Sequence, residues 1–153
     1  MSGHTVEKIG GTSISNTDAV MANILVGDRK GDDLYGRIFV VSAYAGITNQ
    51  LLEHKKTGRP GVYALFAGAS ALEASAWLDA MARLQDEMLK INADRFGDGE
   101  DRQTADAFIL ARIEDARSAL SDLQRLCAHG HFRLDTQLGA AREMLASLGE
   151  AHS

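Results

Sequence analysis

The sequence has very few of the residues that cross-link, divide or anchor a chain. Its single cysteine, Cys127, has no partner for an internal disulfide, and its single proline, Pro60, lies in no proline-rich or serine-rich linker. No apolar run reaches the length of a membrane span or follows a basic start as in a signal peptide. We therefore expect one continuous cytoplasmic unit without a membrane partner.

Clustered positive charge is lacking as well. The 153-residue chain has a formal net charge of -5 and no long basic run, whereas binding to a nucleic-acid backbone needs grouped lysines and arginines. Nucleic acid is therefore not an expected partner. The 45% hydrophobic and 24% charged residues are ordinary for a globular domain, so composition predicts a core but names no function.

The first forty residues have the pattern of a strand, a helix and a second strand. Residues 4–9 alternate polar and apolar side chains and end at Gly10 and Gly11. A set of apolar residues at helical spacing follows: Val20, Met21, Ile24 and Leu25. The β-branched run 38–41 then predicts a strand buried on both faces of a parallel sheet. Together these segments predict a right-handed βαβ unit.

The rest of the chain has helical periodicity. A short helix is expected from about Ile47 to Lys56, after the small-residue turn that ends the second strand. Two long amphipathic helices follow, separated by the acidic loop 96–101, and a last helix is predicted across 138–148. Their apolar residues step by three and four: Trp77, Met81, Leu84, Met88 and Ile91, then Ile109, Ile113, Ala116, Leu120, Leu123 and Cys127. We interpret these stripes as core and not as a cofactor site.

The segment KIGGTS at 8–13 has the features of a phosphate-binding turn. Gly10 and Gly11 allow close approach of an anion because no Cβ intervenes, and the helix that follows offers free N–H groups. Lys8 precedes the glycines, unlike the lysine of a Walker A loop, and the dinucleotide fingerprint does not match either. The two glycines alone favour a purely structural turn, whereas their neighbours Lys8, Thr12 and Ser13 favour an anion site.

KIGGTS resembles the K-[FI]-G-G-T-S signature that opens the aspartate kinases. Two further segments agree with that family in the same order. VVSAYAGITN at 40–49 is similar to V-V-S-A-x-x-G-x-T-[ND], and SLGE at 147–150 matches S-x-G-E. The spacer from Glu53 to Tyr63 looks most like the aspartate kinases associated with ectoine synthesis. The sequence therefore resembles the N-terminal part of an aspartate kinase.

This resemblance implies a fold and a reaction. The fold is the amino-acid-kinase fold, a three-layer α/β/α sandwich around a mainly parallel sheet, here truncated. The reaction transfers the γ-phosphoryl group of ATP, bound with Mg2+, to the β-carboxylate of L-aspartate. Its product, 4-phospho-L-aspartate, begins the pathway to lysine, threonine and methionine, or to ectoine.

The resemblance also implies site residues. Lys8 would be catalytic, meeting the transferring phosphoryl group. The nucleotide phosphates would lie against the first motif: Lys8, Gly10, Gly11, Thr12 and Ser13. Aspartate would be held by residues of the other two motifs: Ser42, Thr48 and Glu150. Taken alone, Thr48 is typical of a helix start and Glu150 of a solvated helix face, so only motif membership gives them a role.

Residues 1–153 would be only the amino-acid-binding part of such an enzyme. The family's nucleotide-binding part and its regulatory ACT region find no counterpart here, so we expect the isolated chain to be inactive. An open sheet edge and uncovered helix faces favour association with a second copy or with a complementing C-terminal part. Two alternatives stay open: a non-catalytic aspartate-binding regulatory or assembly module, and another amino-acid kinase acting on glutamate, acetylglutamate or uridylate.

No metal site is expected in the chain itself. His129 and His131 are close in sequence but lack a cysteine or carboxylate at metal-ligand spacing, which favours a helix-ending loop. A group of aspartates is interpreted as hydrated loop: Asp28, Asp32 and Asp33. Cys127 fits an apolar helix face, and no Ser-His-Asp or Cys-His arrangement indicates acyl transfer.

Overall fold

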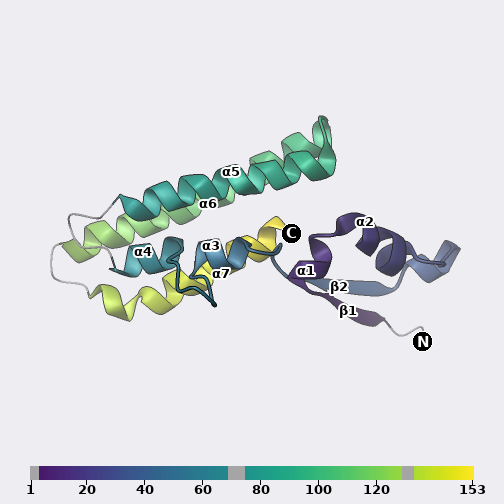
Figure 1. Ribbon diagram of the computed structural model, residues 1–153, viewed down its shortest axis with the longest axis horizontal. Helices are drawn as coiled ribbons and strands as arrows, with labels where there is room; N and C mark the ends of the chain where they lie inside the picture. The colour runs from purple at the N-terminus through teal and green to yellow at the C-terminus, as the bar shows by residue number, and fades with distance from the viewer. Residues whose placement is uncertain (1–3, 69–74, 129–132) are drawn as a thin grey trace.

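The computed structural model describes residues 4–68, 75–128 and 133–153. A small strand–helix unit lies at one end of an elongated body of helices (Figure 1). The chain is mixed α/β and mostly helical, and the sheet of the described residues has two parallel strands, β1 (Thr5–Ile9) and β2 (Arg37–Val41). The wider three-layer sandwich therefore stays a prediction.

The predicted order of strand, helix and parallel strand is confirmed. Val6 pairs with Ile38 and Ile9 pairs with Val41. The connection contains helical segments of several kinds: α1 (Gly11–Ile14), α2 (Thr17–Val20), the π-helix η1 (Met21–Val26) and the 3-10 helix η2 (Gly31–Leu34). Apolar side chains from this connection and from both strands form a small cluster on one face of the sheet, centred on Ile9, Ile14 and Val20.

The expectation that the second strand is buried on both faces is wrong for this structure. Ile38 and Val40 are each 49% exposed, and Val6 of β1 is 68% exposed. These side chains share one face of the pleat, since alternate strand residues point the same way, and the helices cover the other face.

Met21, expected on the apolar helix face, is also exposed. The winding changes from α to π at this residue, so residues three and four apart no longer align.

Arg37 joins both strands to the helical connection. Its guanidinium makes two contacts of 2.7 Å with the Glu7 carboxylate and donates to the carbonyl oxygens of Ile24 and Leu25, also at 2.7 Å. It also stacks 4.6 Å from the centroid of the Phe39 ring. The last carbonyls of a helix lack intrahelical partners, so Arg37 satisfies the end of η1. The hydrogen bond from Arg37 lowers the pKa of Glu7 below its ordinary value.

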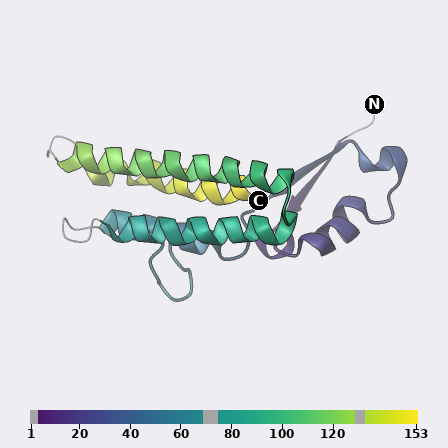
Figure 2. The same ribbon diagram turned by 90° about the horizontal axis from the view of Figure 1, so that it is seen from above.

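The helical body has two layers. Its elements are α3 (Ile47–Leu51), α4 (Val62–Gly68), α5 (Ala76–Phe96), α6 (Glu100–Ala128), η3 (Leu134–Thr136) and α7 (Leu138–His152). Figure 2 shows α6 beside α7 in one layer and α5 in the other, with α3 and α4 behind α5. No helix in the described part of the chain combines the length and the apolar character needed to cross a membrane.

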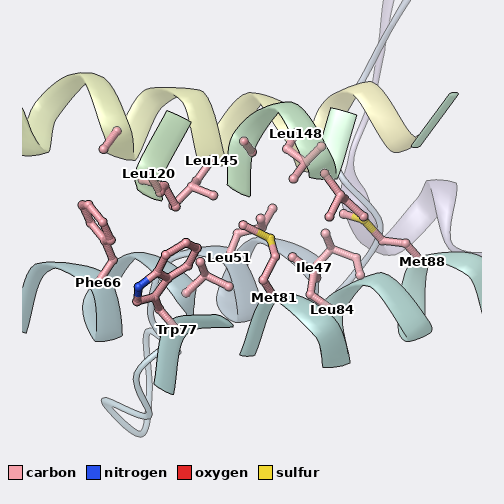
Figure 3. Close-up of a cluster of buried hydrophobic side chains, with 14 of the residues drawn as sticks. Ile47, Leu51, Phe66, Trp77, Met81, Leu84, Met88, Leu120, Leu145 and Leu148 are labelled. Atoms are coloured by element: carbon pink, nitrogen blue, oxygen red, sulfur yellow. The ribbon is translucent and has the colours of Figure 1, made fainter. Parts of the chain in front are cut away.

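The core between the layers confirms the two predicted apolar stripes. Side chains of α3, α4 and α5 point toward those of α6 and α7 (Figure 3). Among the fully buried ones are Ile47, Leu51, Phe66, Trp77, Met81, Leu84, Met88, Leu120 and Leu145. The Trp77 ring meets Phe66 edge to face at 5.6 Å, and its indole N–H donates to Gln124 at 3.3 Å. Cys127 is half-buried on α6.

Several helix boundaries differ from the sequence expectation. The helix expected to reach Lys56 ends at Leu51, because the chain turns into a hairpin closed by an antiparallel bridge between Glu53 and Pro60. Helix α4 was not predicted. Part of the acidic loop belongs to α6, whose first turn contains Glu100 and an aspartate, a favourable place for negative charge. His129 and His131 lie outside the described residues.

Candidate functional site

Lys8 lies near the end of β1, opposite Val40 in the register. It is exposed, and it lies on the uncovered face of the sheet with Val6 because the two are separated by one residue. The strand ends one residue later, at Ile9, where the glycine turn begins. The ammonium group is therefore open to solvent beside the glycine turn of the first motif.

The two glycines of the first motif have different surroundings. A Cβ added at Gly11 would lie 2.4 Å from the carbonyl oxygen of Ala43, whereas nothing lies within 4 Å of one added at Gly10. Gly11 is therefore required for packing against the second motif, VVSAYAGITN at 40–49, and this is a structural role. Gly10 leaves open space, and the exposed residues Thr12 and Ser13 follow in the first turn of α1, where helical N–H groups lack intrahelical partners.

Ser15 joins the first motif to the second. Its hydroxyl accepts the N–H of Ala45 at 2.8 Å and donates to the carbonyl oxygen of Gly11 at 2.8 Å. The Arg95 guanidinium of α5 donates to the Ser15 carbonyl oxygen. Sequence reasoning missed this residue, because its partners Ala45 and Arg95 are distant in the chain and no local pattern indicates them.

The second motif continues the sheet and then starts α3. The N–H of Ser42 donates to the Ile9 carbonyl oxygen at 3.1 Å, so the half-buried Ser42 adjoins the end of β1. Gly46 precedes the helix with a φ of 89°, a left-handed conformation that favours glycine. This turn places Thr48, also half-buried, in the first turn of α3.

The third motif, SLGE at 147–150, packs closely on the second motif through Gly149. A Cβ at Gly149 would lie 2.9 Å from Leu51 Cδ1 and 3.1 Å from Ala43 Cβ. The absence of a side chain thus brings α7 against α3, the helix that carries Thr48. Glu150 follows on the exposed side of α7. All three predicted motifs therefore meet around Ala43.

The end of α7 is fastened by two residues that sequence reasoning missed. The Ser153 hydroxyl donates to the Ser42 carbonyl oxygen at 2.9 Å. The His152 ring meets Tyr44 edge to face at 5.3 Å, and its Nε2 lies 3.1 Å from the Met88 carbonyl oxygen. These contacts come from the last residue of α7 and from the residue that follows it, so they fix the segment that carries Glu150.

A buried polar chain extends from His152 to α6. Its Nε2 is also 3.0 Å from Oδ1 of the buried Asn92, whose amide nitrogen donates to Asp106 at 2.9 Å. Because the contacts of Nε2 are both oxygen acceptors, this nitrogen bears the proton. Nδ1 is buried without a partner among the described residues. Burial lowers the pKa of His152 below its ordinary value, outweighing the opposite effects of Met88 and Asp106, so the ring is neutral near pH 7.

Carboxylates, histidines and cysteines do not gather into a metal-binding group of three anywhere in the ranges 4–68, 75–128 and 133–153. What the arrangement does offer is an exposed ammonium group, the first turn of a helix, hydroxyl groups and an exposed carboxylate around one junction.

Comparison with known proteins agrees with the three motifs. Over 150 residues, which are 98% of this chain, the sequence is 55% identical to the aspartate kinase Ask_Ect of Stutzerimonas stutzeri (strain A1501). The chain spans 31% of the length of that relative. No family model and no solved structure matches. Nearly the whole chain is thus similar to part of an aspartate kinase.

Proposed function

We propose that this chain forms the aspartate-binding part of an aspartate kinase, which transfers the γ-phosphoryl group of ATP to the β-carboxylate of L-aspartate. The observation that carries the proposal is the meeting of the three motifs around Ala43, with Gly11 on one side and Gly149 on the other. The 55% identity to Ask_Ect, which extends over all three motifs, supports it independently.

Lys8 has the chemistry that phosphoryl transfer requires. This reaction needs little covalent participation from the protein and depends on positioning and neutralisation of charge. The Lys8 ammonium is a compact positive charge next to the turn of Gly10, where no side chain blocks an approaching phosphate. The N–H groups at the start of α1 add donors beside it. Mg2+ would arrive with ATP, and we assign none of its ligands to this chain.

Glu150 and Thr48 are suited to a small zwitterion. The exposed Glu150 carboxylate offers a charge-assisted contact to the α-ammonium group of aspartate. Thr48 on the neighbouring helix offers a hydroxyl that can donate or accept, and Ser42 offers a second one at the end of β2. Their helices are held together by the close packing of Gly149 on Leu51, which supports a shared ligand for the two residues.

The uncovered strand face supports the wider fold that we propose. Exposed apolar side chains on this face are Val6, Ile38 and Val40. In the amino-acid-kinase fold, further strands and helices would extend and cover this sheet, and residues 1–153 would be the amino-acid-binding part of that cytoplasmic enzyme. A complementing C-terminal part or a second copy would be the protein partner. The spacer 53–63 favours the ectoine pathway over that of lysine, threonine and methionine.

A chimera tests the proposal without requiring that this chain act alone. The aligned segment of Ask_Ect is replaced by residues 1–150 of this chain, and aspartate-dependent ADP release is measured. We expect turnover by the chimera and none by the 153-residue chain, because incomplete positioning forfeits most of the rate enhancement. A chimera that binds aspartate but never releases ADP would instead favour the non-catalytic module, and one that does neither would refute the proposal.

Substitutions in the chimera assign the roles. Lys8→Ala should lower kcat by roughly 100-fold or more, since it removes charge stabilisation from the transition state, while the exposed Lys90→Ala on α5 should leave kcat unchanged. Glu150→Gln should raise KM for aspartate more than KM for ATP. Glu143→Gln, an equally conservative change on the same helix, should alter neither. Unchanged aspartate affinity in Glu150→Gln would remove that residue from the site.

A further inference from the structure

The spacer between α3 and α4 folds into a fixed hairpin. The N–H of His54 donates to the Arg59 carbonyl oxygen at 2.9 Å, and the N–H of Gly58 donates to the His54 carbonyl oxygen at 2.8 Å. Gly58 has a φ of 67°, which the tight turn requires. At the base of the hairpin, the backbone of Gly61 packs directly on that of α3, because a Cβ added at Gly61 would lie 2.4 Å from the Gln50 carbonyl oxygen. The loop thus has a defined place beside α3 (Figure 2).

This hairpin concentrates positive charge in an acidic chain. Residues 54–59 read HKKTGR and contain no carboxylate, although the whole chain has a net charge of -5. The nearest carboxylate in the hairpin is that of Glu53 at its base, whose Oε1 lies 4.0 Å from a Cβ built at Gly58. Arg59 faces the same pocket as Arg83 of α5, and none of the described residues that line this pocket is acidic. Among the described residues, no ion pair occupies either of the two guanidinium groups.

The pocket has further hydrogen-bond donors and a suitable size. Its volume is about 400 Å³, within the range of small-ligand sites, and Asn49, Gln50 and His54, whose side chains contain hydrogen-bond donors, are among the residues that line it. The Nδ1 atom of His54 accepts the N–H groups of Lys56 and Thr57, each at 3.3 Å. This fixes Nδ1 as the acceptor, so the ring proton of the neutral histidine lies on Nε2, which is left as a donor.

We propose that this pocket, between the 54–59 hairpin, α3 and α5, binds a small oxyanion that bears carboxylate or phosphate groups. A guanidinium presents paired N–H donors that match either group, and the amides add neutral donors. The pocket residues include none of Lys8, Ser42, Thr48 or Glu150. The inference therefore goes beyond the proposed phosphoryl transfer and does not depend on it.

The test is a titration of the isotopically labelled 153-residue chain, followed by backbone amide shifts in NMR. Inorganic phosphate and succinate are added separately at constant ionic strength, with sodium chloride as the reference. We expect saturable shifts in 49–61 and around Arg83 with at least one of the two anions. Saturation by phosphate alone identifies a phosphate-bearing ligand, and saturation by succinate alone identifies a carboxylate-bearing one.

Charge-matched variants decide whether the binding is specific. Arg59→Gln and Arg83→Gln should each weaken the apparent affinity roughly fivefold to tenfold, since each removes a charged hydrogen-bond donor. Arg125→Gln, an exposed arginine of α6, removes the same charge and should leave the affinity unchanged. Absence of saturable shifts with both anions would overturn the proposal. An equal loss in Arg125→Gln would also overturn it, because the effect would then be one of net charge.

Discussion

The helical body and the strand unit differ sharply in how much apolar surface they bury. In the body, residues from α3 to α7 form one continuous core in which Trp77 and Leu84 are essentially inaccessible. In the strand unit, burial is confined to a small cluster around Ile9, while Val6 and Val40 remain open to solvent. The predicted phosphate-binding motif lies in the less buried unit.

This difference indicates where the stability of the chain comes from. Burial of apolar area is the main favourable contribution to folding, at about 25 cal/mol per Å². The helical body supplies most of that area. The strand unit is held instead by polar contacts, those of Arg37 within it and those of Ser15 toward the second motif. The candidate site therefore lies between the well-packed helical body and the incompletely covered sheet.

The largest expected contrast comes from substituting one apolar side chain in each region. Trp77→Ala should lower the free energy of unfolding by about 3–5 kcal/mol, because it leaves a large cavity in the core. Val40→Thr should change it by less than about 0.5 kcal/mol, because the residue is a β-branched surface position. Urea unfolding monitored by circular dichroism measures both. A large loss in Val40→Thr would mean that this sheet face is covered in solution.

A smaller contrast is expected between the neighbouring glycines of the first motif. Gly11→Ala should cost about 1–3 kcal/mol, because its Cβ would collide with the Ala43 carbonyl oxygen and separate the two motifs. Gly10→Ala should cost less than about 0.5 kcal/mol, since its φ of -75° suits any residue and its surroundings are open. Urea unfolding again measures the difference. Equal losses would show that backbone freedom, and not the contact with Ala43, is what the motif needs.

The order of the main strands and long helices, though not the presence of α4, could be predicted from the sequence because their periodicity is local. The stripes that include Met81 and Ile113 identify α5 and α6, and the β-branched run identifies β2. Burial of β2 could not be predicted in the same way. A run such as 38–41 suits a strand covered on both faces, but the covering elements are a property of the whole fold. The π-helical winding at Met21 likewise has no simple pattern.

The motifs of the candidate site were predictable, but the contacts that assemble them were not. KIGGTS, VVSAYAGITN and SLGE could be recognised, and the structure brings all three together. The contacts that do so involve Ser15, His152 and Ser153, whose partners are far away in the sequence. The catalytic and binding roles of Lys8, Thr48 and Glu150 stay predictions, since they concern groups on the substrates.

Removal of Arg37 should have a local effect on the strand unit. Arg37→Met keeps a long apolar stem but removes the ion pair with Glu7 and the hydrogen bonds to η1. We expect faster hydrogen exchange at the amides of β1 and β2 with little change in α5, because local opening depends on local contacts. Arg133→Met removes an exposed ion pair with Asp135 and is the control. Equally faster exchange throughout α5 would mean that the two regions unfold as one.

The smallest expected effect is a pH dependence that originates at the junction of the two regions. The pKa of His152 is lowered in the folded chain, chiefly by burial, from an ordinary value of 6.5. The unfolded state therefore binds more protons than the folded state between the lowered pKa and 6.5, so the free energy of unfolding falls as the pH falls through this window. Protonation would place a second N–H at Nδ1, which is buried without a described partner.

Urea unfolding between pH 7.5 and 5.5 isolates this contribution from the carboxylates. The pKa values of Glu7 and Asp135 are lowered from 4.5 and 3.8 by their arginine partners, so their contributions are lost only at lower pH. His152→Gln should be less stable than the parent at pH 7.5 but should show a flatter pH dependence. His4→Gln, at an exposed position before β1, should keep the parent's slope. If His152→Gln also kept that slope, folding would not lower the pKa of His152, and burial would not be the dominant influence on the ring.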